Sequence, residues 1–262
     1  MTEKEAAMDR REFLFRSAAF SIGSLLGLNS FSRVSASEIS VCEPRIALII
    51  DDIGFSSSRL DMFLEIETVM TFAVLPRLPM SIPLAEKIHF LGYEIMLHQP
   101  MEPADASVDP GPGAVFVGDD EDRIAMIMEE NISEFPFAAG INNHMGSRFT
   151  ACQREMKDVI RTLKDKGLFF VDSLTTNQST GYQAAKSLNV AAARRNIFLD
   201  CELNVSAITG QLEKLKNRAL KTGSAIGIGH PFPETAEAIK MFKKSFSGSN
   251  IKLVKMSSVI PA

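Results

Sequence analysis

The sequence predicts an α/β fold, a distorted (β/α) barrel of seven to eight mostly parallel strands in a single domain. Two patterns lead to this prediction. Short apolar runs alternate with longer amphipathic segments, as parallel strands alternate with the helices that cover them. The number of apolar runs in one chain of 262 residues favours closure into a barrel over the alternative, a doubly wound open sheet.

Eight strands and six helices are expected in order along the chain. The apolar runs predict strands at 45–51, 69–75, 93–98, 137–143, 168–172, 188–193, 225–230 and 251–256. The amphipathic segments predict helices at 56–66, 81–91, 119–134, 151–166, 204–222 and 233–245. Gly92 and Gly167 follow two of these helices, where a C-terminal cap favours glycine, and Pro83 lies in a first helical turn, where proline is tolerated.

Residues 103–119 interrupt this alternation with a long segment rich in proline and glycine. A loop of this length within a compact domain is usually either functional or disordered. Because the segment closely follows His98, we expect it to form one wall of an active-site cleft. A flexible insertion is the alternative.

The first 36 residues are expected to be a twin-arginine export signal and not part of the fold. Arg10-Arg11 is followed by an apolar stretch at 17–28 and by Val34-Ser35-Ala36, small residues of the kind that signal peptidase recognises. The alternative is an amphipathic helix or an anchor that is retained after export. Residues 37–44 are then a linker and residues 45–262 the catalytic domain, and we expect an exported, periplasmic protein.

Composition limits the partners that this chain is expected to have. The formal net charge of −4 and the isoelectric point near 5.7 give no support for nucleic-acid binding. No apolar run reaches the length of a normal membrane span, so no stable span is expected after signal cleavage. Cys42, Cys152 and Cys201 lack the C-x-x-C spacing of a metal site and are expected to be small buried residues. None of these patterns indicates an oligomeric state.

The first predicted strand ends in two adjacent acids, Asp51 and Asp52. Two neighbouring carboxylates at the end of a buried strand repel each other and lose hydration, which is costly unless a positive charge lies beside them. A bound metal ion meets this need, with one acid as its ligand and the other as a proton acceptor. Ligands of α/β proteins bind at this end of the strands.

Three of the four histidines fall at predicted strand ends on the same side of the sheet as the acid pair. They are His98, His144 and His230, whereas His89 lies inside a predicted helix and is assigned no function. Because all strand C-termini of a barrel converge on one face, these side chains can meet although they are distant in sequence. An aspartate with two neutral imidazoles makes a catalytic metal site that keeps positions open for water and substrate.

Further acids occur near strand ends. Asp172 closes its predicted strand and is expected to orient a catalytic histidine through the second ring nitrogen. Glu102 lies four residues after His98. For Asp200 the preferred interpretation is the ordinary one, a helix N-cap or a turn.

Five motifs together resemble the divergent polysaccharide deacetylases, a branch of the polysaccharide deacetylase superfamily. They are Ile-Asp-Asp-Ile-Gly at 50–54, Leu-His-Gln-Pro-Met-Glu at 97–102, Gly-Ile-Asn-Asn-His-Met-Gly-Ser-Arg-Phe-Thr at 140–150, Phe-Val-Asp-Ser at 170–173 and Gly-His-Pro at 229–231. The resemblance spans about residues 45–258. It implies a distorted (β/α) barrel with a divalent metal, often zinc, and removal of N- or O-acetyl groups from sugars.

The resemblance also implies roles for individual residues. Asp51 matches the general base and Asp52 a metal ligand, while His98 matches a metal-binding histidine. His230 matches the general acid that protonates the leaving group, and Asp172 matches the acid that supports it.

Two departures from the superfamily pattern concern the metal site. Glu102 stands where the ordinary family has a second metal histidine, and the usual arginine-proline motif is missing near residues 142–144. We therefore expect His144 to be the second metal histidine, with Glu102 as the alternative ligand.

The expected function is a metal-dependent hydrolase that removes acetyl groups from a cell-envelope polysaccharide, such as a peptidoglycan-like glycan. The expected cofactor is zinc or another divalent metal. The alternative is a catalytically weak or inactive periplasmic protein that uses the same cleft to bind glycan or a partner. A phosphoester hydrolase is disfavoured because the acids of the usual aspartyl-phosphate motif are separated by one residue, and here they are adjacent.

Overall fold

The computed structural model describes residues 43–245 and 250–260, which fall in one compact unit, Cys42–Ala262. The predicted twin-arginine signal at 1–36, most of the linker at 37–44 and Cys42 lie outside the described residues. Among the helices of the described part, none is long and apolar enough to span a bilayer.

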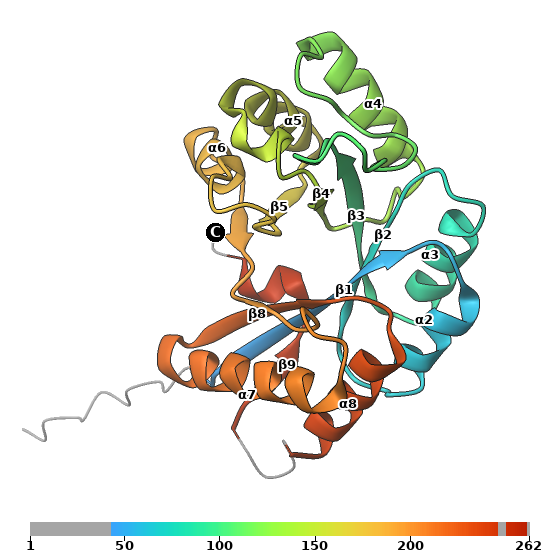
Figure 1. Ribbon diagram of the computed structural model, residues 1–262, viewed down its shortest axis with the longest axis vertical. Coiled ribbons are helices and arrows are strands. Elements are labelled where there is room, and N and C mark those ends of the chain that lie inside the picture. Colours follow the sequence, from blue (N-terminus) through green and yellow to red (C-terminus); the bar gives the residue numbers. More distant parts are fainter. Residues whose placement is uncertain (1–42, 246–249, 261–262) are drawn as a thin grey trace, which may run out of the picture. The chain divides into compact units, whose positions relative to one another are not determined.

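The described residues form one sheet of nine strands in which each paired neighbour is parallel (Figure 1). The strands are β1 (Arg45–Ile53), β2 (Thr71–Val74), β3 (Glu94–Met101), β4 (Gly140–Met145), β5 (Phe169–Asp172), β6 (Ala192–Arg194), β7 (Ile197–Phe198), β8 (Ser224–Gly229) and β9 (Lys252–Val254). Their order is β6-β5-β4-β3-β2-β1-β8-β7, and β9 pairs with the start of β1. The sheet curls into an incompletely closed barrel, which confirms the predicted fold class.

The barrel is incomplete between β6 and β7, the two edges of the strand order. No ladder joins these strands within the described residues, and only Arg195 and Asn196 separate them in sequence. The amide of Arg195 bonds to β5 and that of Asn196 bonds to β8, at 3.0 and 2.9 Å. The backbone therefore crosses the gap that a closed barrel would bridge with a strand pair.

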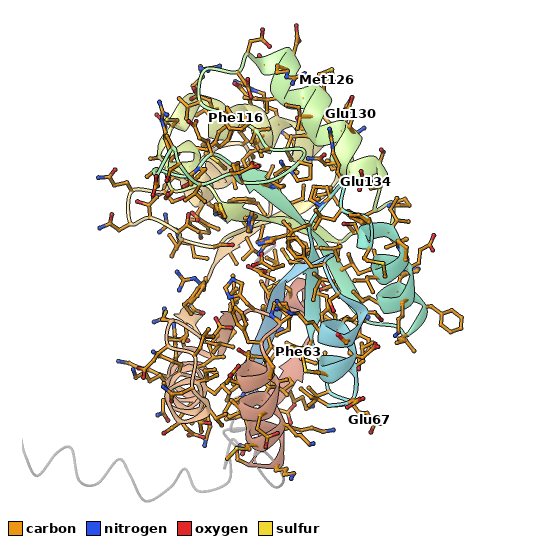
Figure 2. The ribbon with its side chains drawn as sticks, turned by 45° about the vertical axis from the view of Figure 1, so that its right-hand side comes forward. Phe63, Glu67, Phe116, Met126, Glu130 and Glu134 are labelled. Atoms are coloured by element: carbon orange, nitrogen blue, oxygen red, sulfur yellow. The ribbon has the colours of Figure 1, made fainter. Side chains whose placement is uncertain are left out.

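Helices cover the outside of the sheet (Figure 1). They are α2 (Ser57–Leu64), α3 (Ser81–Phe90), α4 (Glu121–Ser133), α5 (Gln153–Lys166), α6 (Gly181–Ser187), α7 (Val205–Thr222) and α8 (Pro233–Ser245), with short 3-10 turns at Phe149–Ala151 and Met256–Val259. Each helix has one buried and one exposed face. Phe63 lies on the buried face of α2 and Glu130 on the exposed face of α4, and Figure 2 labels both residues. The sequence did not predict α6 or the two-residue strand β7.

Strand side chains alternate between two cores. Ile46, Leu48 and Ile50 of β1 pack with the helices, whereas Ala47 and Ile49 belong to a smaller cluster inside the barrel. The interior cluster also contains Ala73, Met96, Phe169, Val171, Ala193, Ile226, Ile228, Met256 and Val259. Burial on both faces explains why the strands read as nearly continuous apolar runs.

The same alternation positions the functional side chains. The polar residues Asp51, His98 and His230 each lie two positions after an interior residue, namely Ile49, Met96 and Ile228 in that order. Because side chains two apart share a face, these groups continue the interior row at the C-terminal end of the barrel.

Candidate metal centre

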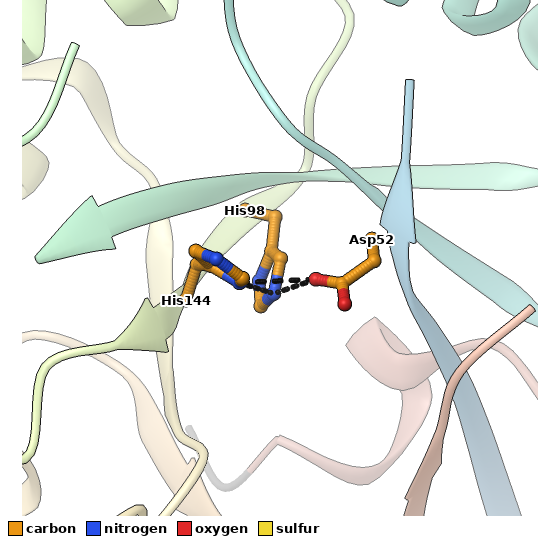
Figure 3. A group of neighbouring side chains, drawn as sticks. All are labelled: Asp52, His98 and His144. Atoms are coloured by element: carbon orange, nitrogen blue, oxygen red, sulfur yellow. Dashed lines mark hydrogen bonds and ion pairs between the residues drawn. The ribbon is translucent and has the colours of Figure 1, made fainter. Parts of the chain in front are cut away.

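Asp52, His98 and His144 bring three donor atoms together from β1, β3 and β4 (Figure 3). Asp52 Oδ1 lies 3.1 Å from His98 Nε2 and 3.0 Å from His144 Nδ1, and the two ring nitrogens are 3.2 Å apart. Ligand atoms about 2.0–2.2 Å from a tetrahedral zinc ion are roughly 3.3 Å from one another. The distances between the three donor atoms are therefore close to those between the ligands of a zinc ion.

A β-bulge turns Asp52 toward this triangle. In the pairing of β1 with β2 the register shifts between Ile50 and Ile53, so that β1 holds one extra residue. Asp52 has a φ of 56°, a left-handed conformation in which aspartate is more common than most side chains. Without the bulge, strict alternation would direct Asp51 and Asp52 to opposite faces of the sheet.

Asn142 orients the ring of His98. The Asn142 side chain donates from Nδ2 to Asp51 Oδ1 at 2.8 Å, which leaves its Oδ1 facing His98 Nδ1 at 2.9 Å. His98 Nδ1 must then carry the proton, and Nε2 presents a lone pair to the triangle. This is the arrangement of a metal-binding histidine whose other nitrogen donates to a neighbouring oxygen.

The polar atoms of the triangle fit a cation better than they fit one another. Asp52 Oδ1 is buried and has no hydrogen-bond partner, although two ring nitrogens lie within 3.1 Å of it. Burial opposes the charge of Asp52, but His144 and His98 lower its pKa, so the carboxylate is ionised. An ionised oxygen beside the lone pair of His98 Nε2 has the donor chemistry of a divalent metal site.

Asp51 lies beside the triangle without joining it. Its side chain is almost fully buried, and Oδ2 is 3.7 Å from His98 Nε2. Burial raises the pKa of Asp51, against the lowering effect of the neighbouring His98 and His230. A carboxylate with a raised pKa is a stronger base than an exposed one, and its position lets it serve a water molecule at the triangle.

His230 faces the same site from the end of β8, and Asp200 holds it there. His230 Nε2 lies 4.0 Å from Asp52 Oδ2. Asp200 Oδ1 is 3.0 Å from His230 Nδ1, and Asp200 Oδ2 accepts from the His230 backbone N–H at 2.6 Å and from the Thr235 hydroxyl at 2.9 Å. Burial lowers the pKa of His230, but the bond to Asp200 and the charges of Asp51 and Asp52 outweigh it and raise the pKa to about 9.

The expectation that Asp172 supports His230 is wrong in this structure. The Asp172 carboxylate instead accepts from the Ser179 hydroxyl at 2.8 Å and from the backbone N–H groups of Leu174 and Tyr182. The physical reason is strand alternation, since Val171 faces the barrel interior and its neighbour Asp172 faces the helices. Asp200, which we expected to be a cap or turn residue, takes the supporting position.

Glu102, the alternative ligand, fastens a loop and does not join the donor group. Its Oε1 pairs with Arg148 at 2.7 Å and its Oε2 accepts from the Val117 backbone N–H at 2.7 Å. Both carboxylate oxygens are therefore engaged. His144 completes the triangle in place of Glu102.

The loop at 103–119 reaches the centre. Residues 109–112 line a cavity of about 260 Å³ together with Asp52 and His144. The loop therefore forms a wall beside the donor triangle, where the sequence places a cleft. His89 stacks on Phe137 and is not among these residues. Cys152 is a half-buried free thiol and Cys201 an exposed one, so the expectation that the cysteines are buried is wrong for Cys201.

Several known proteins are similar to this chain in sequence and in fold. A model of the divergent polysaccharide deacetylase family matches residues 48–260. The chain is 31% identical over 249 residues to the uncharacterized protein YibQ of Escherichia coli K12, covering 95% of this chain and 74% of YibQ. The crystal structure of uncharacterized protein ATU2773 from Agrobacterium tumefaciens C58 matches with a TM-score of 0.76 and 25% identity, over 83% of this chain and 89% of that one.

A more distant likeness concerns the fold alone. A mutant of BA3943 from Bacillus anthracis, a CE4 family pseudoenzyme with restored enzymatic activity, matches with a TM-score of 0.51 and 13% identity, over 83% of this chain and 67% of that one. The family expected from the motifs is confirmed by the match across residues 48–260 and by the relative at 31% identity: the chain belongs to the divergent polysaccharide deacetylase family.

Proposed function

We propose that the protein is a metal-dependent hydrolase that removes N- or O-acetyl groups from a cell-envelope polysaccharide. One observation carries the proposal. The donor triangle of Asp52, His98 and His144 has a buried base, Asp51, on one side and a carboxylate-supported histidine, His230, on the other. Hydrolysis of an amide or ester needs this combination of an electrophilic centre, a base and an acid.

Each residue has a part in the hydrolysis. Asp52, His98 and His144 would hold the ion, which when bound polarises the acyl carbonyl and acidifies a water. Asp51 accepts a proton from that water while the water oxygen forms its bond to the acyl carbon. His230 donates the proton on Nε2 to the departing nitrogen or oxygen as the acyl bond breaks, so that a carboxylic acid and an amine or alcohol result.

The pKa directions suit these parts. The raised pKa of Asp51 increases its strength as a base, and the pKa of His230 near 9 keeps that ring protonated at neutral pH. Asp200 and Asn142 are positioning residues, since each acts through a neighbour.

The metal and the substrate class are part of the proposal. Two imidazoles and one carboxylate are a ligand set that zinc accepts, and zinc is the ion that we propose. A peptidoglycan-like or other envelope glycan is supported by the family and by the twin-arginine pattern in residues 1–36, from which we propose export to the periplasm. The competing proposal is a periplasmic protein that binds glycan or a partner in the same cleft without turnover.

Acetate release from acetylated oligosaccharides tests the proposal. Zinc-loaded protein should release acetate, and Asp51→Asn should lower kcat by about 10²–10⁴ while keeping its zinc. His98→Ala should lose the zinc itself. Asp165→Asn, the same change at an exposed site on α5, is the control and should behave as wild type. Zinc-loaded wild type that releases no acetate from any acetylated glycan would support the binding protein instead.

A further inference from the structure

The cavity beside the donor triangle is mainly apolar. Its volume is about 260 Å³, and Asp52, Asp109 and His144 are the polar side chains that line it. A methyl group, like a water, occupies on the order of 30 Å³, so the cavity is several times larger than the methyl group of an acetyl substituent. The apolar side chains that line it include Phe55, Leu75, Leu78, Pro110, Pro112 and Met145.

The position of His230 decides which half of a substrate this cavity receives. The acyl carbon carries two substituents, the leaving group and the acyl chain. The leaving group must lie near His230, which protonates it, and His230 does not line the cavity. Asp52 separates the two sides, because its Oδ2 faces His230 while its Oδ1 faces His144. The acyl chain therefore points to the side of His144, where the cavity lies.

The lining suits an alkyl chain better than a sugar ring. Sugar rings commonly stack on tryptophan or tyrosine, whose flat faces carry a polar tip. This sequence has no tryptophan, and its two tyrosines, Tyr93 and Tyr182, do not line the cavity. Phe55 is the one phenylalanine in the lining, and it is 64% exposed.

The loop wall of the cavity is held in place by buried amides. Gln99 and Asn131 are fully buried, and both donate to the Gly113 carbonyl, at 2.9 and 2.8 Å. Asn131 also donates to Gln99 Oε1 and accepts from Arg77 Nε. These bonds join the loop to β3 and α4, the helix on which Figure 2 labels Met126 and Glu130. They fasten Gly113, which directly follows the lining residues Gly111 and Pro112.

We propose that this cavity is an acyl-chain subsite and that the enzyme removes aliphatic acyl groups of about four to six carbons in preference to acetyl. The inference rests on the proposed hydrolysis and refines the acyl group on which it acts. Each methylene moved from water into an apolar site favours binding by a factor of about four. Butanoyl has two more methylenes than acetyl, which corresponds to about fifteenfold.

Paired kinetics test the preference. With zinc-loaded protein, kcat/KM for 4-nitrophenyl butanoate should exceed that for the acetate by about fifteenfold. Leu78→Trp fills the cavity and should bring this ratio to about one. Leu220→Trp, the same change at an exposed position of α7, should keep the wild-type ratio. A wild-type ratio of one or less, with measurable acetate turnover, overturns the inference and leaves the proposed hydrolysis standing.

A binding measurement decides the matter without turnover. Because the sequence has no tryptophan, Phe55→Trp places a single indole at the cavity rim. Titration of this zinc-loaded variant with hexanoate should shift the emission at concentrations at least tenfold below those needed for acetate. Phe90→Trp, an indole at a position that is 89% exposed and outside the cavity lining, should show no shift.

The two measurements separate the possible failures. If no ester is hydrolysed and hexanoate still shifts the Phe55→Trp emission, the proposed hydrolysis fails and the apolar subsite stands. If hexanoate and acetate act alike, or if Phe90→Trp responds as Phe55→Trp does, the subsite is refuted. This second measurement holds even if Leu78→Trp does not fold.

Discussion

Replacement of Asn142 by leucine should weaken metal binding by about 10- to 100-fold without unfolding the protein. Asn142 is fully buried and touches no metal directly, but it accepts from His98 Nδ1 at 2.9 Å and donates to Asp51 Oδ1 at 2.8 Å and to Ser173 Oγ at 3.3 Å. Leucine has a similar shape and removes all three bonds. His98 Nδ1–H then loses its buried partner, at a cost of about 1–3 kcal/mol, which corresponds to the expected range of affinity.

Competition with a zinc chelator measures this affinity, and thermal unfolding reports the fold. Asn131→Leu is the matched control, because Asn131 is equally buried and has three side-chain hydrogen bonds, none of them to the donor triangle. The control should lower Tm and leave the zinc affinity within about twofold of wild type. A folded Asn142→Leu variant with wild-type zinc affinity would refute the role assigned to Asn142.

Three further changes test neighbouring contacts. Asp200→Asn removes a carboxylate that, against the effect of burial, helps raise the pKa of His230 to about 9. The stabilisation that comes with this raised pKa is complete below the unfolded value of 6.5 and is lost as the pH rises through 9. The Tm difference between metal-free wild type and variant should therefore shrink between these two pH values, and a constant difference would contradict this. Glu102→Gln should keep full zinc content and lower Tm by about 2–4 °C, since it weakens a loop contact only; loss of zinc would return Glu102 to the ligands. Gly140→Ala should destabilise by about 1–3 kcal/mol in urea unfolding because its Cβ would lie 2.3 Å from a phenylalanine ring, whereas Gly210→Ala has open space and should not.

The convergence of the site could be predicted from sequence because it depends only on parallel strands. Once the apolar runs are assigned as strands of one parallel sheet, all their C-terminal residues must meet on one face. His98, His144 and His230 meet there for this reason, although the last lies 132 positions after the first. No detail of packing enters that prediction, so errors of a few residues in the strand ends did not disturb it.

The partner of His230 could not be predicted in the same way, because it depends on which face of a strand each side chain takes. The run at 168–171 is apolar throughout and Asp172 after it is buried too, so the sequence does not reveal which side chains face the barrel interior. Asp200 follows β7, a strand of two residues that has too few side chains to show any period. The choice between these acids requires the three-dimensional register.

The acid pair shows why a site can depend on a departure from regular structure. A regular β1 would send Asp51 into the barrel and Asp52 toward the helices, and only one carboxylate would reach the centre. The bulge adds one residue and places Asp52 at φ 56°, a conformation that costs about 1–2 kcal/mol for a side chain with a Cβ. That cost persists where function requires it, and here it lets two adjacent acids take different parts. Asp52 directs Oδ1 into the donor triangle while Asp51, held by Asn142, remains beside it as the base.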